Sequence, residues 1–406
     1  MKEKICITGM GLLGSFGIGK EAFRQAISGG RSCLKPVGKY DFDRLAGEVP
    51  DFNLADYFRD KRTLKYAAVT QYALAAAKLA VDDSGLNTKN LDSEKMAIFF
   101  ATDAGGGSVT ETICDTIIEK GYKSVNPILF QQSVFNAPAS LLSIIWGIKG
   151  PCITLPMGFS SGGAALDIAA SYFLNHDIDT ALVIASDELA EVAHRAYDHL
   201  KLLTPNNDRE EGMRPFDADR NGFAASEGAA ALILERESSA LARQSRIYGY
   251  IAGSSMASDG YRPADIDPMG TGASLAMTRA ISDAGLDRED IDLVVAMAPS
   301  DQKVDKMEAT AIRGVFGHPD DDVPVTSIKS SIGESFASAG LFNVCAALQA
   351  IEAGMIPPTI NFNRPDPDID LDIVANTARA KKVDTVLCNA YSWGGIYNTV
   401  IARRYA

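Results

Sequence analysis

The sequence predicts an α/β fold with mixed sheets, built from two related halves. Three observations indicate this fold: a length of 406 residues, short buried strands that alternate with helical patterns, and a faint internal repeat. A chain of this length exceeds the usual size of one domain, so we expect either two domains or one large fold of fused halves. Both options provide a large buried core.

Apolar runs and helical patterns alternate along the chain. The apolar runs predict buried strands at residues 5–7, 97–101, 181–185, 229–234, 293–296 and 386–387. Helical patterns, several of them closed by Gly or Asn, fall at residues 21–28, 66–83, 137–145, 161–174, 273–284 and 341–353. Alternation of this kind is typical of α/β proteins.

The internal repeat relates segments of the first half to segments of the second. Asp179-Thr-Ala-Leu-Val-Ile precedes Ser226-Glu-Gly-Ala-Ala-Ala-Leu-Ile-Leu-Glu235, as Asp384-Thr-Val-Leu-Cys precedes Trp393-Gly-Gly-Ile-Tyr-Asn-Thr-Val-Ile-Ala402. Pro151-Cys-Ile-Thr and Pro324-Val-Thr-Ser each precede a predicted helix. We therefore predict an N-terminal half at residues 1–240 and a C-terminal half at 241–406, packed as one compact unit.

Composition and charge exclude several classes of function. The chain is 46% hydrophobic and 22% charged, as expected of a compact globular protein. No apolar stretch approaches the ~18 residues of a membrane span, so we expect a cytoplasmic protein without a membrane partner. The net charge of −13, without a local Lys/Arg cluster to offset it, argues against nucleic acid as a partner.

Cysteine and histidine usage indicates no metal site. The six cysteines are scattered without CxxC spacing, and only four histidines are present. We therefore expect neither zinc nor a disulfide framework, and no cofactor.

Several motifs occur in a fixed order along the whole chain. They are Ile7-Thr-Gly-Met-Gly11, Gly147-Ile-Lys-Gly-Pro151, Arg214-Pro-Phe-Asp-Ala-Asp-Arg-Asn-Gly-Phe223, Ser327-Ile-Lys-Ser-Ser-Ile-Gly333, Pro357-Pro-Thr-Ile-Asn361 and Asn389-Ala-Tyr-Ser-Trp-Gly-Gly395. In this order they resemble the β-ketoacyl-acyl-carrier-protein synthase family. The resemblance implies a thiolase-like fold, in which two pseudo-repeated halves form a five-layered α-β-α-β-α core.

The same resemblance shows where the family's nucleophile is missing. Family members carry the growing acyl chain as a thioester on a cysteine at a helix N-terminus, where the helix dipole favours the thiolate. The matching segment here reads Met157-Gly-Phe-Ser-Ser-Gly162, which places Phe159 at the cysteine position. A phenyl ring has no lone pair with which to attack a carbonyl.

The family's two catalytic histidines are also replaced. They donate hydrogen bonds to the thioester oxygen while the enolate forms. Met297, eight residues before Asp305, and Glu334, five residues after Lys329, stand at their positions. A thioether cannot donate a hydrogen bond, and an ionised carboxylate would repel the enolate. Lys329 and Glu308 match residues that the family carries, and we expect Lys329 to form a structural salt bridge with Glu334 or Glu308.

A family member without these three groups resembles a chain-length factor. Such a subunit pairs with an active ketosynthase and shapes the tunnel for the growing chain, so it is part of an acyltransferase complex and is not catalytic on its own. The resemblance implies a heterodimer, acyl-carrier-protein docking mainly through the partner, and an aromatic polyketide or aryl polyene product. The implied pocket and tunnel residues are Val109, Thr110, Ile113, Phe135, Tyr391 and Trp393.

Two other functions remain open. One is a residual decarboxylating or priming ketosynthase, although both histidines are absent. The other is a serine hydrolase, because Gly158-Phe-Ser-Ser-Gly162 satisfies GxSxG and would make Ser160 the nucleophile. Its base would be one of His176, His194, His199 and His318, the first and last in loops and the other two on a surface.

Overall fold

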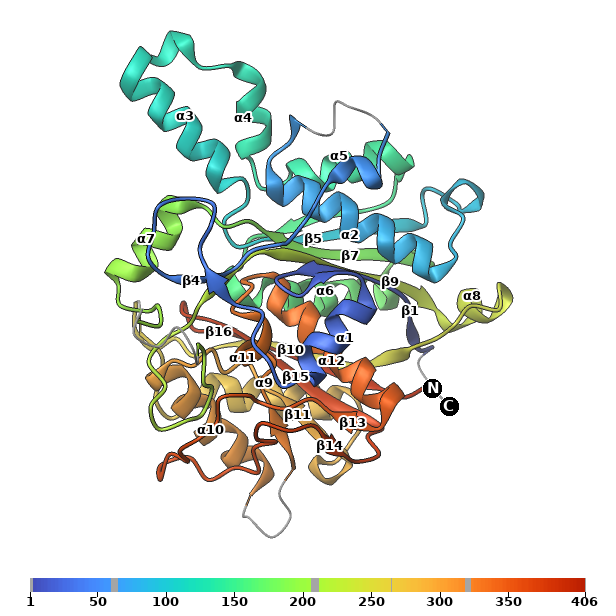
Figure 1. Cartoon of the computed structure of the whole chain (residues 1–406). Coiled ribbons are helices and arrows are strands. Elements are labelled where there is room, and N and C mark those ends of the chain that lie inside the picture. Colours follow the sequence, from blue (N-terminus) through green and yellow to red (C-terminus); the bar gives the residue numbers. More distant parts are fainter. Residues whose placement is uncertain (1–2, 60–64, 206–211, 264, 318–322, 406) are drawn as a thin grey trace.

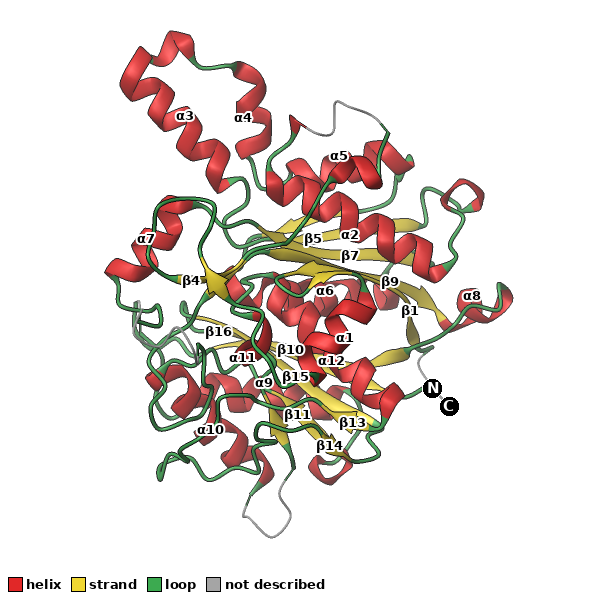
Figure 2. Ribbon diagram, viewed as in Figure 1, coloured by secondary structure: helices red, strands yellow, loops and turns green. Residues whose placement is uncertain are grey.

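The computed structural model describes residues 3–59, 65–205, 212–263, 265–317 and 323–405. Two groups of strands are separated by a middle layer of helices that includes α6 (Ser161–Asn175) and α12 (Ser338–Ala353). Helix α2 (Ala68–Ser84) covers one outer face and α9 (Thr271–Asp283) covers the other (Figures 1 and 2). The predicted five-layered α-β-α-β-α core is thus confirmed.

Each half contributes five strands, and their spatial order is mirrored. The first-half strands lie in the order β6 (Cys152–Leu155), β5 (Met96–Ala101), β7 (Thr180–Asp187), β9 (Gly228–Arg236) and β1 (Ile5–Gly14). The second-half strands lie in the order β12 (Val325–Thr326), β11 (Leu293–Val295), β15 (Thr385–Ser392), β16 (Ile396–Arg403) and β10 (Gly249–Ser258). Strands β1 and β10 pair antiparallel, which joins the two groups into one continuous sheet.

Shorter strands and peripheral helices complete the described chain. The short strands are β2 (Gly17–Ile18), β3 (Lys35–Pro36), β4 (Leu45–Gly47), β8 (Ala225–Ser226), β13 (Met355–Ile356) and β14 (Arg379–Ala380). The remaining α-helices are α1 (Lys20–Ser28), α3 (Gly107–Lys120), α4 (Pro127–Ser133), α5 (Ala137–Trp146), α7 (Glu191–His199), α8 (Glu237–Ala242), α10 (Gln302–Phe316) and α11 (Lys329–Ile332). Helices α3 and α4 form a hairpin that projects from the body (Figure 1).

Glycines set the close spacing of the layers. A Cβ added to Gly11 of β1 would lie 1.9 Å from the backbone oxygen of Ala76, so α2 rests directly on the strand backbone. A Cβ added to Gly340 of α12 would lie 2.6 Å from the backbone nitrogen of Gly163 in α6. The two central helices therefore touch backbone to backbone, a contact that any larger side chain would force apart.

The internal repeat corresponds to these two groups of strands. Strands β7 and β9 form an antiparallel pair in the first half, as β15 and β16 do in the second. Every predicted strand and helix is present. The strands and helices that were not predicted include β6, β10, β12, β16, α3, α4, α7, α8, α10 and α11. Strand β10 is rich in small residues, and one of them, Gly253, would bring an added Cβ within 2.6 Å of the backbone of α9. The boundary between residues 240 and 241 stays a prediction.

Candidate functional site

The positions singled out in the sequence converge at one end of the middle layer. Phe159 lies in the turn between β6 and α6, and Met297 follows β11. Lys329 begins α11 and Glu334 follows it, while Trp393 lies in the turn between β15 and β16. Turns from both halves therefore build one site.

Phe159 is the centre of an aromatic cluster. Its ring is 6% exposed and meets those of Phe336 and Trp393 edge to face, with centroid distances of 5.1 Å and 5.0 Å. Tyr197 and Phe223 complete the cluster at 6.3 Å and 6.1 Å. Edge-to-face packing of this kind is favourable for aromatic rings. The ring thus fills, by packing, the position at which the family resemblance implies a nucleophile.

A buried ion pair adjoins this cluster through the backbone of Phe336. The Lys329 Nζ is 2.6 Å from the Glu334 Oε2, and both side chains are almost completely buried. The other carboxylate oxygen of Glu334 accepts a hydrogen bond from the Phe336 backbone nitrogen at 3.2 Å. Burial raises the pKa of the Glu334 carboxyl, and the Lys329 ammonium opposes that rise. Of the two partners expected for Lys329, the one it contacts is Glu334.

Glu308 holds the segment around Met297 in place. Its carboxylate accepts hydrogen bonds from the backbone nitrogens of Met297 at 3.0 Å and Ala298 at 2.7 Å, and from Asn389 Nδ2 at 2.9 Å. Burial raises the pKa of this carboxyl, while the three donors oppose the rise. The Met297 side chain offers no proton to the site, so it cannot donate a hydrogen bond to a ligand as the histidine implied by the family resemblance would.

Three residues of the site were not predicted from the sequence. Asp187, at the end of β7, is fully buried and accepts hydrogen bonds from Thr102 Oγ1 at 2.8 Å and from the Ala337 backbone nitrogen at 2.9 Å. Burial and the neighbouring Asp103 raise its pKa to about 8. The Tyr197 hydroxyl donates to Asp103 Oδ2 at 3.3 Å. The only signal in the sequence is an acidic pair directly after an apolar strand.

Two cavities adjoin the aromatic cluster. The outer one, of about 810 Å³, is lined by Phe159, Tyr197, Trp393 and Asp103 among others. The inner one, of about 10 Å³, shares Asp103 and Tyr197 with it and also borders Phe336. A space of ~10 Å³ holds about one water molecule, so the inner cavity is no tunnel for an acyl chain.

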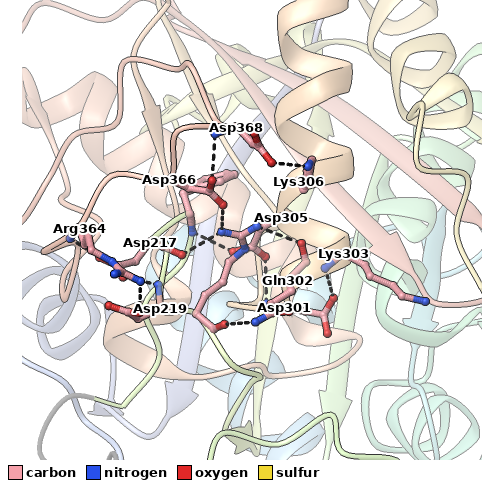
Figure 3. Close-up of polar contacts among 12 residues, drawn as sticks. Asp217, Asp219, Asp301, Gln302, Lys303, Asp305, Lys306, Arg364, Asp366 and Asp368 are labelled. Atoms are coloured by element: carbon pink, nitrogen blue, oxygen red, sulfur yellow. Dashed lines mark hydrogen bonds and ion pairs between the residues drawn. The ribbon is translucent and has the colours of Figure 1, made fainter.

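The rim of the outer cavity is fixed by a polar network (Figure 3). Asp301 caps α10 by accepting hydrogen bonds from the backbone nitrogens of Lys303 and Val304. Arg220 donates to Asp366 at 2.6 Å and to the backbone oxygen of Gln302 at 3.0 Å. Asp301, Gln302 and Lys303 line the cavity, so this network sets the position of its rim.

The six pocket and tunnel residues divide into two groups. Tyr391 and Trp393 border a small cavity beside Met297. Val109, Thr110, Ile113 and Phe135 belong to the α3–α4 hairpin and the segment after it, and none of them lines the outer cavity. Phe135 is 43% exposed and packs on Gly105, where an added Cβ would lie 2.5 Å from its ring. Within this single chain the two groups do not share a cavity described above.

Ser160 lacks the surroundings of a hydrolase nucleophile. Its hydroxyl donates to the Met157 backbone oxygen and lies 3.0 Å from Ser392 Oγ, and no histidine of the described residues hydrogen-bonds to it. His176 and His199 are exposed, as expected, and His318 lies outside the described residues. The surface position expected for His194 is wrong. That ring is buried, and its Nδ1 lies 2.7 Å from Tyr40 Oη because α7 packs against the loop that carries Tyr40.

His194 gives a testable dependence of stability on pH. Burial lowers the pKa of its imidazole from 6.5 to about 4. Between these pH values the unfolded chain binds a proton that the folded chain does not. The free energy of unfolding therefore falls as the pH falls. We expect His194→Asn to lose less stability than wild type between about pH 7.5 and pH 4.5, by on the order of 3 kcal/mol in urea unfolding. Equal losses of stability in wild type and His194→Asn would contradict a lowered pKa for His194. His199→Asn, at an exposed position, is the control.

Two further features of the described residues concern metals and membranes. No group of three or more His, Cys, Asp or Glu side chains there is arranged to hold a metal ion. No single helix there is long and apolar enough to cross a membrane. Helices α4 and α5, which meet at a bend of 95°, together have the length and apolar composition of such a span.

Comparisons with known proteins agree with this architecture. The beta-ketoacyl synthase N-terminal domain matches residues 2–240, and the C-terminal domain of that name matches residues 248–363. The 3-oxoacyl-[acyl-carrier-protein] synthase 2 of Coxiella burnetii is 30% identical over 410 residues and covers 99% of both chains. The structure of the ishigamide ketosynthase/chain length factor has a TM-score of 0.94 at 28% identity, with both chains covered completely.

A further solved structure shows a relative with a bound carrier protein. It is described as AntDE:AntF, a type II PKS acyl-carrier protein in complex with its ketosynthase bound to the hexaketide. It has a TM-score of 0.90 at 25% identity and full coverage of both chains. From the domain matches, the full-length relative and the shared fold, this chain belongs to the β-ketoacyl synthase family.

Proposed function

We propose that this chain is the non-catalytic chain-length factor of a type II polyketide or aryl polyene synthase. It would pair with an active ketosynthase and shape the tunnel into which the acyl chain grows. The proposal is supported by the residues Phe159, Met297 and Glu334 at the three positions that motif spacing assigns to the family's catalytic groups. The phenyl ring and the thioether are buried by packing, and the carboxylate is held in an ion pair. None of the three can act as the family's groups do.

The surface of the projecting hairpin supports a permanent partner. Seven large apolar side chains of α3, α4, α5 and the adjoining segments are exposed, namely Ile117, Ile118, Tyr122, Ile128, Phe130, Phe135 and Ile144. Strand β6 ends the sheet, and within the described residues no strand pairs with its outer edge. Exposed apolar patches and open strand edges are features that stable association covers.

The negative charge of this chain favours docking of the carrier protein mainly on the partner. Acyl carrier proteins of this family are acidic, and this chain carries a net charge of −13. Like charges slow encounter and weaken an interface, so a more basic partner is the better docking surface. The decarboxylating alternative lacks support from the site, because neither Met297 nor the paired Glu334 offers an N–H to an enolate oxygen.

Co-expression with an active type II ketosynthase from the same organism tests the pairing. Size exclusion should give one heterodimer containing both chains in equal amounts, whereas separate elution of the two chains would contradict the proposal.

Thr110→Trp tests the tunnel within that complex. Thr110 is exposed on α3, so the larger ring can be placed without disturbing this chain's core. We expect a product shorter by one or more extension units, detected by mass spectrometry, while the partner still acylates itself. Thr112→Trp, on the other side of the same helix, is the matched control and should leave the product unchanged. An unchanged product from Thr110→Trp would leave the tunnel role without support.

A further inference from the structure

Helix α7 spans the distance between the projecting hairpin and the outer cavity. Its N-terminal end faces α3, and its C-terminal end continues into Leu200, Lys201 and Leu202, which line the outer cavity. Val192, in the first turn of the helix, is 65% exposed. The helix is held at its two ends, along its inner face and by the loop that carries Tyr40.

The N-terminal end of α7 depends on a residue of α3. Its N-cap residue is Ala190, which has no side-chain acceptor for the free backbone N–H groups of the first turn. Glu111 of α3 supplies that acceptor, because its Oε1 accepts a hydrogen bond from the Val192 backbone nitrogen at 2.7 Å. A carboxylate at this end of a helix also interacts favourably with the helix dipole.

The inner face of α7 forms the partition between the two cavities. Tyr197 lines both cavities and donates to Asp103 at 3.3 Å, and Asp103 also lines both. The Tyr197 ring stacks on that of Phe336 with centroids 5.8 Å apart, and Phe336 packs against Phe159. A displacement of α7 must therefore change the wall of the outer cavity and the packing of Phe159.

A second contact fixes the same region. Ser108, in the first turn of α3, donates through its backbone nitrogen and its hydroxyl to Glu188, at 2.9 Å and 2.6 Å. Gly107 lies so close to Ala190 that an added Cβ would approach the Ala190 Cβ to 2.9 Å. The start of α3 and the start of α7 are thus one packed junction.

We propose that α7 couples the hairpin surface to the outer cavity, with Glu111 as the positioning residue. This inference rests on the proposed function, since the partner is what would pack on the hairpin. When the partner docks and immobilises α3, Glu111 keeps its hydrogen bond to the first turn of α7. The helix then stays in place, and Tyr197 keeps its hydrogen bond to Asp103. Partner binding and the shape of the outer cavity become linked properties.

The test compares Glu111→Ala with Glu111→Gln in the full chain. Glutamine retains an oxygen that can accept the Val192 N–H, so it should behave as wild type. Glu119→Ala, at an exposed position near the far end of α3, is the matched control. All variants carry Trp146→Phe, which leaves Trp393 in the outer cavity as the single tryptophan.

Two readouts separate coupling from a merely structural role. Amide hydrogen exchange of α7 should rise about 2- to 30-fold in Glu111→Ala, the fold-change that corresponds to a lost cap worth about 0.5–2 kcal/mol. Acrylamide quenching of Trp393 should rise in the same variant and in neither of the others. In the wild-type heterodimer both readouts should fall below those of the isolated chain.

Faster exchange of α7 without a change in Trp393 quenching would overturn the proposal, as would equal quenching in Glu111→Ala and Glu119→Ala. If the partner does not bind at all, size exclusion shows it directly, and the proposed function fails. The comparison of variants in the isolated chain decides the coupling in either case.

Discussion

Replacing Phe159 by alanine is expected to lower the free energy of unfolding by about 3–5 kcal/mol, the usual cost of deleting a buried aromatic side chain. The ring contacts four other aromatic side chains from different parts of the chain, so its loss leaves a cavity that no single neighbour can fill. Urea unfolding followed by circular dichroism measures the change.

Phe130→Ala is the matched control for this substitution. Phe130 lies on the hairpin and is 66% exposed, so its removal should change the stability of the isolated chain by about 0.5 kcal/mol or less. A loss below ~1 kcal/mol for Phe159→Ala would mean that the ring is not the packing element inferred here.

Neutralising one side of the buried ion pair should have an effect of similar size. Glu334→Gln leaves the Lys329 ammonium buried without a counter-charge, and breaking a buried pair in this way costs about 3–5 kcal/mol. Urea unfolding at neutral pH gives the value. The double variant Lys329→Met with Glu334→Leu should recover most of the loss, because replacing a whole buried pair by apolar residues is often neutral.

An exposed pair provides the comparison for the buried one. Lys306 and Asp368 form an ion pair whose side chains are 51% and 62% exposed, and Asp368→Asn should leave stability nearly unchanged. If Glu334→Gln were equally mild, Lys329 would have to lose its proton in the variant, and the pair would not be the structural link between α11 and the aromatic cluster.

The three degenerate positions are predicted from sequence because motifs on either side fix their register. Phe159 precedes an ordered Ser-Ser-Gly-Gly run, and Met297 and Glu334 lie at fixed intervals from Asp305 and Lys329. The two halves were visible for a similar reason, since strand and helix patterns recur in the same order.

The remainder of the site depends on tertiary contacts that no local pattern records. Asp103, Asp187 and Tyr197 come from three separate segments. The pairing of β5 with β7 brings the first two together, and the packing of α7 adds Tyr197. Helix α7 itself was not predicted, because its cap is supplied by Glu111 of another helix and not by its own N-cap residue. Buried His194 was assigned to the surface because the residues that cover it, Tyr40 and Phe42, lie in a distant loop.

The central claim is that this chain carries no acyl group in the working synthase. It is tested by intact-mass spectrometry of the heterodimer after incubation with malonyl-loaded acyl carrier protein and the starter unit. We predict an acyl adduct on the ketosynthase partner and an unchanged mass for this chain. A covalent acyl adduct on this chain, at Ser160 or elsewhere, would contradict the account.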